Sequence, residues 1–383
     1  MTAARQLQYV AFRLDMQYAE RVMSEDIYTV ILAAGSYIPS RRVGNADFLQ
    51  AEFFEGYDKP YDPSKIGAMV KKFEAITDIV ERRYVVDDLV TSDMATHAAQ
   101  NALANSGIDR ESLDYIVFAH NFGDVRADNR RSDFVPSLAA RVKQKLEIHN
   151  PRCVAYDLPF GCAGWLQGVI QADYYIRSGD AKRALVIGAE TLSRVSDPHD
   201  RDSMLYSDGA GCVILEARSS EEPVGVLAHA TRSDTLEHAS LMWMGKSFNP
   251  DFDGDALFLK MRGRKLYEYA VTTVPELVRE NLEKAGARLG DVDKILMHQA
   301  NAKMNGAILK RLFSLEGDGG APSGIMPMTI SLFGNSSVAT LPTLLDLILE
   351  GGIEGQSLES GDLVIFAAVG AGMNISSMVY RWP

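Results

Sequence analysis

An internal duplication is the feature of this sequence that most constrains its fold. Three segments from the first part of the chain recur, in the same order, in the second part. The members of a pair share local features, such as a helix end, a polar turn and then a short apolar run. The pairs are residues 106–120 with 285–299, Gly161-Cys162 with Gly334-Asn335, and the Ser-Gly-Asp segments that begin at Ser178 and Ser360. Each likeness is weak alone, but three in one order predict two similar halves.

Both halves alternate short apolar runs with longer amphipathic segments, which is typical of an α/β fold with mainly parallel strands. We expect a first half over residues 27–216, a second over 223–383, and an N-terminal extension over 1–26. Two such halves packed face to face bring equivalent strand ends together, so we expect the functional site in a cleft there. The expected strands are 28–33, 115–119, 184–188, 211–215, 294–297 and 363–367, and the expected helices are 92–106, 162–178, 264–284 and 337–350.

The charge balance and the cysteine content narrow the class of protein. The 383 residues carry 51 acidic and 39 basic side chains, a net charge of -12, which argues against a nucleic-acid binder. No stretch has the uninterrupted apolar length of a membrane span, and charges interrupt the N-terminal extension, so it does not read as a secretory signal. The extension is expected either to dock on the body or a partner chain, or to be a frayed tail. Three irregularly spaced cysteines indicate a reducing compartment, so we expect a cytoplasmic protein.

Cys162 is the most informative single residue of the sequence. It lies in the segment AspLeuProPheGlyCysAlaGlyTrp, where a loop with proline and glycine leads into a helical pattern. A cysteine at a helix N-terminus meets the positive end of the helix dipole, which lowers the thiol pKa and favours a nucleophile. The alternative, a small buried hydrophobic residue, suits Cys153 and Cys212 because each lies beside or within an apolar strand.

A nucleophilic cysteine needs a partner that handles protons or stabilises charge. Of the seven histidines, His298 is the strongest candidate because it follows a predicted strand at the end where α/β sites form. His120 also ends a strand and is a weaker candidate. The other histidines lie in polar or helical contexts that indicate surface positions.

Asn335 occupies the position in the second half that Cys162 occupies in the first. An asparagine in a loop that opens a helix is usually a cap, but here the pseudosymmetry brings it close to Cys162. Cysteine, histidine and asparagine at one point form an acyl-transfer site, in which the cysteine carries the acyl group and the other two donate hydrogen bonds to an oxygen. Backbone N–H groups of Cys162 and of Ala371, in the Gly-Ala-Gly tract 370–372, are candidates for an oxyanion hole. That tract reads equally as a tight turn.

Taken together, these motifs resemble the β-ketoacyl-acyl-carrier-protein synthase III group of the thiolase superfamily. The resemblance covers nearly all of the chain from Ile27 onward. It rests on IleLeuAlaAlaGlySerTyrIlePro at 31–39, GlyCysAlaGly at 161–164, AspGlyAlaGly at 208–211, HisGlnAlaAsn at 298–301, GlyAsnSerSer at 334–337 and the C-terminal MetValTyrArgTrp. The resemblance implies a duplicated thiolase-like fold of five layers, α/β/α/β/α, with two mixed sheets, and a homodimer.

The resemblance also implies a reaction. Cys162 would take an acyl group from a thioester, and His298 and Asn335 would stabilise the enolate formed when malonyl-carrier protein loses carbon dioxide. That carbanion would attack the acyl group and give a β-ketoacyl thioester. Because decarboxylation supplies the carbanion, we expect no metal and no redox cofactor, only acyl groups delivered on carrier protein or coenzyme A.

Further residues match the parts of the family that receive acyl carrier protein. Gly263 and Tyr267 match the helix that lines the pantetheine tunnel, and Lys303 matches a basic docking position. Neighbouring basic residues could form, together with Lys303, a positively charged docking surface in an otherwise acidic chain. For the more distant of these residues, an ordinary solvent-exposed position without a docking role is the alternative. These residues are Arg262, Arg264, Lys265, Lys310 and Arg311.

Departures from the family pattern point to a specialised relative from secondary metabolism. The family often has an aromatic residue and an arginine that clamp the adenine of coenzyme A, and Lys72 and Ile76 stand at those places. Residues 51–64 and the N-terminal extension are additions to the basic pattern. The sequence leaves open a head-to-head condensation of two acyl or β-ketoacyl chains, with Asp124 as one possible base. It also leaves open a non-condensing acyltransferase to an alcohol or amine, whereas the intact motifs argue against a silent partner subunit.

Overall fold

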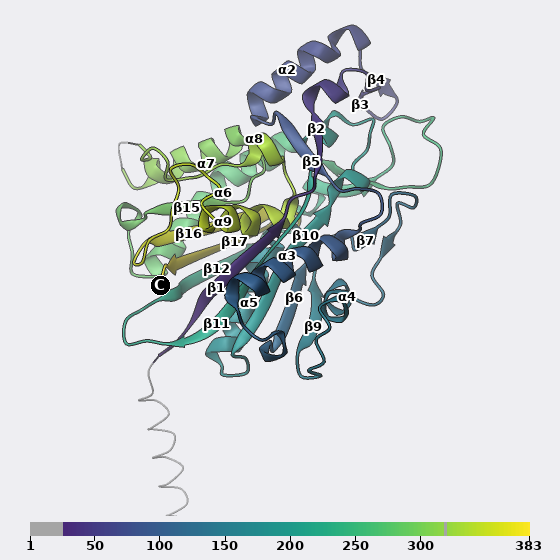
Figure 1. Cartoon of the computed structure of the whole chain (residues 1–383). Coiled ribbons are helices and arrows are strands. Elements are labelled where there is room, and N and C mark those ends of the chain that lie inside the picture. The colour runs from purple at the N-terminus through teal and green to yellow at the C-terminus, as the bar shows by residue number, and fades with distance from the viewer. Residues whose placement is uncertain (1–25, 318–319) are drawn as a thin grey trace, which may run out of the picture.

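The computed structural model describes residues 26–317 and 320–383, and these form two mixed β-sheets with helices around and between them (Figure 1). The first sheet has the strand order β1-β11-β10-β6-β9. Along this order, β1 pairs with β11 and β11 pairs with β10 in antiparallel fashion. The pairs β10 with β6 and β6 with β9 are parallel. These strands are β1 (Ile27–Tyr37), β6 (Tyr115–Ala119), β9 (Val154–Leu158), β10 (Arg183–Thr191) and β11 (Asp208–Ser219).

The second sheet repeats the pattern of the first with one strand fewer. Its order is β12-β17-β16-β15, with two antiparallel pairings followed by one parallel pairing. The strands are β12 (Gly225–Ser233), β15 (Lys294–Met297), β16 (Leu363–Gly370) and β17 (Asn374–Arg381). Strands β6 and β15 come from one pair of duplicated segments, and β10 and β16 come from another. The duplicated α/β fold predicted from the sequence is therefore confirmed.

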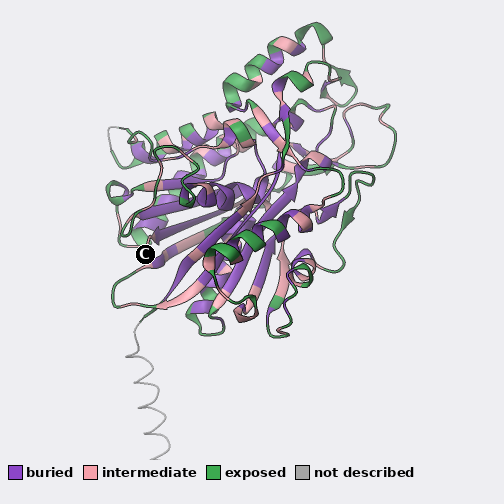
Figure 2. Ribbon diagram, in the orientation of Figure 1, coloured by how far each residue is buried: buried purple, intermediate pink, exposed green. Residues whose placement is uncertain are grey.

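The helices complete five layers. The central layer holds α5 (Gly164–Arg177) and α9 (Thr340–Leu349), whose apolar side chains pack in one core with residues of both sheets, such as Val186 and Phe366. On the outer side of the first sheet, α3 (Thr91–Ser106) and α4 (Leu138–Lys145) form a second core. On the outer side of the other sheet, α6 (Gly263–Lys284) and α7 (Ala302–Leu315) form a third. The strands of the two sheets are mostly buried, apart from β9 and the end of β12, while the outer helices expose one face to solvent (Figure 2).

The predicted elements agree with the structure within a few residues at their ends. The predicted helix 264–284 is α6, in which Pro275 is accommodated inside the helix. The predicted helices 162–178 and 337–350 each begin with a short 3-10 turn, Gly161–Ala163 and Ser337–Ala339, before α5 and α9. The strands of the first sheet lie between residues 27 and 219 and those of the second between 225 and 381. The division into separate domains stays a prediction.

Smaller elements lie around the two sheets. The predicted insert 51–64 forms a small hairpin and the 3-10 turn Pro63–Lys65, next to α2 at the top of Figure 1. The N-terminal extension, apart from Asp26, lies outside the described residues. In the part of the chain that is described, no helix has the length and apolarity needed to cross a membrane. The remaining elements are β2 (Arg41–Gly44), β3 (Phe54–Gly56), β4 (Lys59–Pro60), α2 (Ile66–Thr77), β5 (Glu81–Tyr84), β7 (Asp124–Val125), β8 (Ser132–Asp133), β13 (Met242–Gly245), β14 (Phe258–Met261) and α8 (Ile330–Phe333).

Candidate active site

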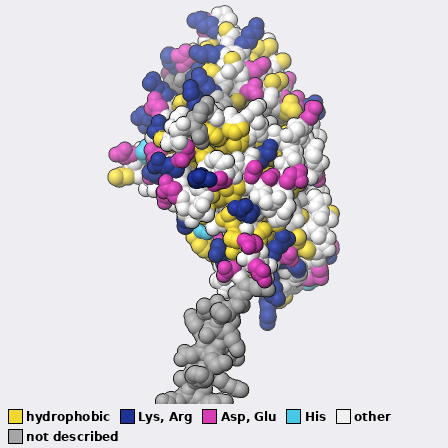
Figure 3. Space-filling model, turned by 90° about the vertical axis from the view of Figure 1, so that its left-hand side faces the viewer, with side chains coloured by type: hydrophobic (Ala, Val, Ile, Leu, Met, Phe, Trp, Pro, Cys, Tyr) yellow, Lys and Arg dark blue, Asp and Glu magenta, His cyan; other side chains and the backbone are white. Residues whose placement is uncertain are grey.

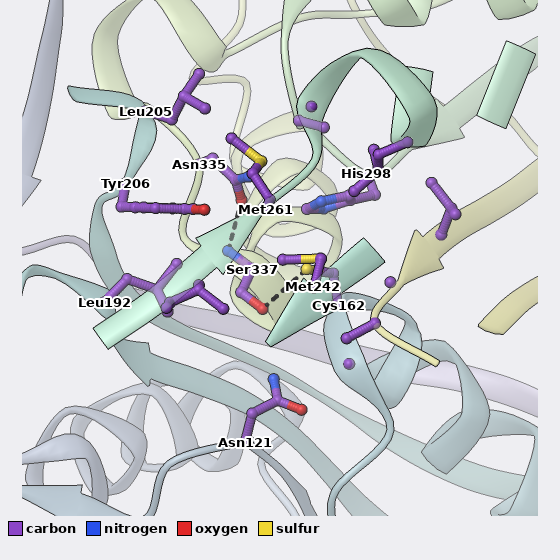
Figure 4. A pocket seen from close by; sticks show the side chains of 18 of the residues that line it. Asn121, Cys162, Leu192, Leu205, Tyr206, Met242, Met261, His298, Asn335 and Ser337 are labelled. Carbon is purple, nitrogen blue, oxygen red and sulfur yellow. Dashed lines mark hydrogen bonds between the residues drawn. The ribbon is translucent and has the colours of Figure 1, made fainter. Parts of the chain in front are cut away.

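A cavity of about 290 Å³ lies where the two halves meet, and its lining is mainly apolar (Figure 4). Cys162, His298 and Asn335 all line it, although 173 residues of sequence separate the first from the last. The duplication explains this convergence, because the loop before α5 and the loop before α9 occupy equivalent positions at the junction of the halves. The cleft expected from the sequence is therefore present and contains the three predicted residues.

Close backbone packing holds Cys162 in the middle of the 3-10 turn Gly161–Ala163 that precedes α5. Gly161 has a φ of +61°, and a Cβ there would lie 2.5 Å from the backbone nitrogen of Ala371. A Cβ on Gly370 would lie 2.2 Å from the backbone nitrogen of Cys162. Both positions therefore require glycine. As a result the turn 370–372 lies directly against the nucleophile loop, and the backbone nitrogens of Cys162 and Ala371 both lie where these two loops touch.

The thiol of Cys162 is mainly protonated at neutral pH in this structure. Burial raises its pKa to about 11, and the hydroxyl of Ser337, which donates a hydrogen bond to Sγ at 3.2 Å, opposes that rise. The sequence predicted a lowered pKa from the helix dipole, so the direction of that prediction is wrong. The physical reason is that removing the thiolate from water costs more free energy than the helix dipole and one hydrogen bond from a hydroxyl contribute to stabilising it.

His298 is held neutral by burial. The side chain is 3% exposed, and desolvation lowers its pKa to about 4, so the imidazole carries no charge at neutral pH. Its Nδ1 lies 2.7 Å from Oγ1 of Thr340, in the first turn of α9. The same hydroxyl lies 3.0 Å from the carbonyl oxygen of Ser337. A neutral histidine beside a protonated thiol differs from the thiolate–imidazolium pair of many cysteine enzymes.

Asn335 is oriented by the backbone of the loop that follows it. Its Oδ1 accepts a hydrogen bond of 2.8 Å from the backbone nitrogen of Ser337, as Figure 4 shows. Because this bond occupies Oδ1, the amide nitrogen Nδ2 is left to face the cavity as a donor. The backbone of Asn335 is anchored to the other half of the chain, since its nitrogen donates to the Leu205 carbonyl and its carbonyl accepts from the Ser207 nitrogen.

The mouth of the cavity lies beside the N-terminal ends of α6 and α7. Gly263 and Tyr267, the predicted tunnel residues, both line the cavity. The guanidinium of Arg262 lies 5.8 Å from the ring centre of Trp243, which also lines the cavity. Lys303 is exposed in the first turn of α7, and the other predicted docking residues are exposed as well; these are Arg262, Arg264, Lys265, Lys310 and Arg311. The face shown in Figure 3 mixes basic, acidic and apolar side chains and has no broad basic area.

Other predicted residues lie outside the cavity lining. Asp124 is buried, and its carboxylate accepts bonds of 2.7 Å from the nitrogen and the hydroxyl of Ser92 and from Arg141. The imidazole of His120 is also held by other residues. Its Nδ1 accepts a hydrogen bond from the Gly123 nitrogen, and its Nε2 lies 3.0 Å from the carboxylate of Asp157. Lys72 and Ile76 are exposed on α2. The described residues contain no cluster of histidine, cysteine or carboxylate side chains suited to a metal ion.

The sequence reasoning missed four polar residues of the site. Ser337 and Thr340 contact Cys162 and His298 directly. Ser337 is the last residue of the motif GlyAsnSerSer, so the motif contained the signal, and Thr340 follows one helical turn later. Tyr206 and Asn121 also line the cavity. Asn121 lies just after β6 and Tyr206 just before β11, and neither belongs to a recognisable motif. Only the tertiary structure therefore reveals their positions in the site.

The fold and this convergence of cysteine, histidine and asparagine define a thiolase-like condensing enzyme. Residues 156–235 match the family of 3-oxoacyl-[acyl-carrier-protein] synthase III, and residues 282–382 match the C-terminal part of the same family. A β-ketoacyl-[acyl-carrier-protein] synthase III from Mesorhizobium japonicum is 32% identical over 93% of this chain and 100% of its own length. The corresponding protein of Erythrobacter litoralis is 34% identical over 79% of this chain and 88% of its own.

Solved structures agree with these sequence matches. The synthase III of Aquifex aeolicus superposes with a TM-score of 0.72 at 30% identity, covering 92% of this chain and 100% of that one. The synthase III of Thermus thermophilus gives a TM-score of 0.75 at 28% identity, with 92% and 99% covered. The chain therefore belongs to the β-ketoacyl-acyl-carrier-protein synthase III family.

Proposed function

We propose that the chain forms carbon–carbon bonds by decarboxylative Claisen condensation of an enzyme-bound acyl group with malonyl-acyl-carrier protein, giving a β-ketoacyl thioester. The observation that carries this proposal is the meeting of Cys162, His298 and Asn335 in one largely apolar cavity. Family membership supports it, because the relatives in the comparison are named for this synthase activity.

In the first half-reaction, Sγ of Cys162 attacks the carbonyl carbon of an acyl thioester. The new carbon–sulfur bond forms as the old one breaks, and the carrier thiol leaves with the proton that Cys162 gives up. The backbone N–H groups of Cys162 and Ala371 hold the oxyanion that forms on the way. The hydroxyl of Ser337 supports the sulfur as it loses its proton, since it already donates to Sγ at 3.2 Å.

In the second half-reaction, the malonyl thioester loses carbon dioxide and leaves an enolate. Nδ2 of Asn335 and Nε2 of His298 donate hydrogen bonds to the enolate oxygen. For Nε2 to carry the proton, the hydroxyl of Thr340 must donate to Nδ1 at 2.7 Å rather than to the Ser337 carbonyl. The neutral state of His298 suits this role, because a neutral donor does not hold the malonyl carboxylate as an ion pair. The enolate carbon then attacks the carbonyl carbon of the acyl group, the carbon–sulfur bond to Cys162 breaks, and the released thiolate takes a proton from water.

The partners proposed for this reaction are an acyl carrier protein and a second copy of the chain. Gly263 and Tyr267 form the proposed pantetheine tunnel. We propose that the carrier protein docks at its mouth on four exposed basic side chains, Lys303, Arg262, Arg264 and Lys265. An acidic carrier would be attracted by these positive charges. A homodimer is supported by β9, which ends its sheet with Val154 48% exposed and so offers an unpaired strand edge. We propose a cytoplasmic location and no metal or redox cofactor.

We propose further that the chain is a specialised member that serves secondary metabolism. The support is the presence of Lys72 and Ile76 at the positions where the family pattern has its coenzyme A clamp, together with the insert at 51–64. A head-to-head coupling would need a carboxylate base, and Asp124 is fully engaged with Ser92 and Arg141. The decarboxylative reaction needs no such base and is therefore the better supported of the two.

The test is intact-protein mass spectrometry after exposure to acyl-carrier protein, followed by addition of malonyl-carrier protein. We expect one acyl group per chain in the wild type and none in Cys162→Ala, whereas Cys153→Ala, a buried cysteine outside the cavity, is acylated normally. His298→Ala and Asn335→Ala should accept the acyl group but release carbon dioxide at least about 100-fold more slowly. Unchanged acylation of Cys162→Ala would refute the nucleophile, and an acylated wild type that never condenses would refute the reaction.

A further inference from the structure

Part of the cavity wall is a hairpin that belongs to neither of the two large sheets. Strands β13 and β14 form a two-stranded sheet of their own. Four apolar side chains of this hairpin line the cavity, namely Met242, Met244, Leu259 and Met261. Figure 4 shows Met242 and Met261 among the side chains that surround the cavity together with Cys162. The hairpin therefore bounds the space in which that cysteine reacts.

The position of the hairpin makes its attachment to the rest of the chain important. A two-stranded hairpin is marginally stable in water unless it packs against other elements, and one face of this hairpin borders a cavity instead of a closed core. Its backbone is tied to the first half of the chain by the Leu259 nitrogen, which donates to the Val195 carbonyl at 2.8 Å. A firm wall needs a further attachment on the other face.

Lys260 provides that attachment. It lies in β14 between two residues that line the cavity, so its side chain points to the opposite face of the hairpin, where it is 2% exposed. Its Nζ donates to Oδ2 of Asp197 at 2.6 Å and to Oδ2 of Asp200 at 3.2 Å, and it lies 3.3 Å from the ring centre of Phe248. Two carboxylates and an aromatic face thus surround a buried ammonium group, and such surroundings stabilise a cation away from water.

Asp197 connects the first half of the chain to both strands of the hairpin. It lies between β10 and β11, and besides Lys260 in β14 it binds the segment just after β13. There it accepts hydrogen bonds from the Ser247 hydroxyl at 2.9 Å and from the Phe248 nitrogen at 2.8 Å. Burial raises the pKa of Asp197, but the hydrogen bonds that it accepts, first that from Lys260, outweigh this effect and hold the pKa below its ordinary value. Asp197 is therefore a carboxylate at neutral pH.

The charge of Lys260 also fixes the register of the hairpin. Successive side chains of a strand point to opposite faces, so a shift of one residue would place Lys260 in the apolar cavity and turn Leu259 and Met261 away from it. Breaking a buried ion pair leaves an uncompensated charge and is strongly unfavourable, whereas replacing the whole pair with apolar residues often costs little stability. The position that the pair imposes on the cavity wall therefore explains it better than a contribution to stability does.

We propose that Lys260 is a positioning residue that, through Asp197 and Asp200, holds the hairpin in place as a wall of the cavity and so determines which acyl chains Cys162 accepts. This inference rests on the proposed function, because the chain in question is the one that Cys162 carries. Lys260 does not touch the reacting atoms. It acts through the residues on either side of it in β14, which line the cavity.

The experiment compares acetyl, hexanoyl and decanoyl thioesters of carrier protein as acyl donors. The rate of Cys162 acylation is followed by intact-protein mass spectrometry, without any malonyl thioester. We expect the wild type to prefer one chain length. In Lys260→Met, which removes the charge but keeps an unbranched side chain, the wall is no longer held. The ratio between the fastest and the slowest chain should then fall by about tenfold, the lower end of the discrimination that a shaped apolar pocket provides.

The ratio separates positioning from stability, because a loss of folded protein slows all three rates equally. Arg141→Met is the matched control, since Arg141 makes a largely buried ion pair of 2.7 Å with Asp124 outside the lining of this cavity. It should lower the Tm and leave the ratio unchanged. Asp200→Asn is a second variant in case Lys260→Met folds poorly. Asparagine still caps the turn 201–205 and Lys260 keeps one carboxylate, so the ratio should fall by a smaller factor.

A wild type without any chain preference would overturn the inference. The same conclusion would follow from a wild-type ratio in whichever of the two variants is folded, or from an equal fall of the ratio in the control. Acylation of the wild type by none of the three thioesters would instead refute the proposed function itself.

Discussion

Glu190 lies at the end of β10, behind the cavity, and its carboxyl group is wholly buried. One oxygen accepts two hydrogen bonds from Asn121, and the other has no partner among the described residues. Desolvation raises the pKa of this group to about 7 from its ordinary 4.5. The folded protein therefore favours the neutral acid, and a shift of this size corresponds to about 3 kcal/mol at pH values above both pKa values.

The sign of the effect on stability follows from this shift. Because the pKa is higher in the folded state, the folded protein binds more protons, and the free energy of unfolding falls as the pH rises through about 7. Between about pH 5.5 and about pH 8.5 the loss amounts to about 2 kcal/mol. For a chain of this length that is a decrease in Tm of about 2–3 °C. Glu190→Gln keeps an acceptor for Asn121 and has no charge to gain, so it should lack this component.

The assay is thermal unfolding of the wild type, Glu190→Gln and the exposed control Glu221→Gln at both pH values. The Tm of the wild type relative to Glu190→Gln should fall by about 2–3 °C on going to the higher pH, whereas Glu221→Gln should follow the wild type. Alkylation of Cys162 by iodoacetamide at about pH 8 gives a second readout. It should be faster in Glu190→Gln because the ionised carboxylate adds to the effect of burial in raising the thiol pKa. A Tm difference that does not change with pH would refute this account of Glu190.

Two further predictions concern the backbone at the nucleophile and the surface at the cavity mouth. Gly370→Ala places a Cβ 2.2 Å from the nitrogen of Cys162, so the loop must move by about 1 Å and acylation should slow by about 100-fold. Gly306→Ala, where a Cβ meets nothing within 4 Å, is the control, and acylation of Gly370→Ala at the wild-type rate would contradict the packing argument. Lys303→Glu should lower kcat/KM for malonyl-carrier protein by about tenfold with little change for malonyl-coenzyme A. Lys182→Glu, an equal charge reversal at the far end of β10, should change neither value, and an equal loss with both substrates in Lys303→Glu would exclude a docking role.

Much of the architecture could be read from the sequence because it depends on local patterns. Short apolar runs such as residues 115–119 and 294–297 can pack only as buried strands between amphipathic helices, and both are strands in the structure. The duplicated segments fixed which strands correspond. The edge strand β9 was not predicted, because its five residues include Asp157 and do not form a continuous apolar run; none of them is fully buried in the structure.

The candidate site could be predicted only in part. Cys162, His298 and Asn335 stand in motifs whose loops open helices or follow strands, so their convergence followed from the duplication. The protonation states did not follow, because they depend on how much water reaches each group. Burial raises the pKa of Cys162 and lowers that of His298, and no local pattern states how deeply either side chain lies.

The sequence by itself determined the duplicated α/β pattern and the three residues that meet in the cavity, since periodicity, glycine positions and repeated motifs are properties of the chain. Tertiary structure alone decided the surroundings of those residues. It turned Asp124 and His120 into buried structural partners of Arg141 and Asp157, and it left the hydroxyl of Tyr206 unpaired in the cavity wall. The physical reason is that desolvation and hydrogen-bond partners are set by groups that are not neighbours in sequence and come together only when the chain has folded.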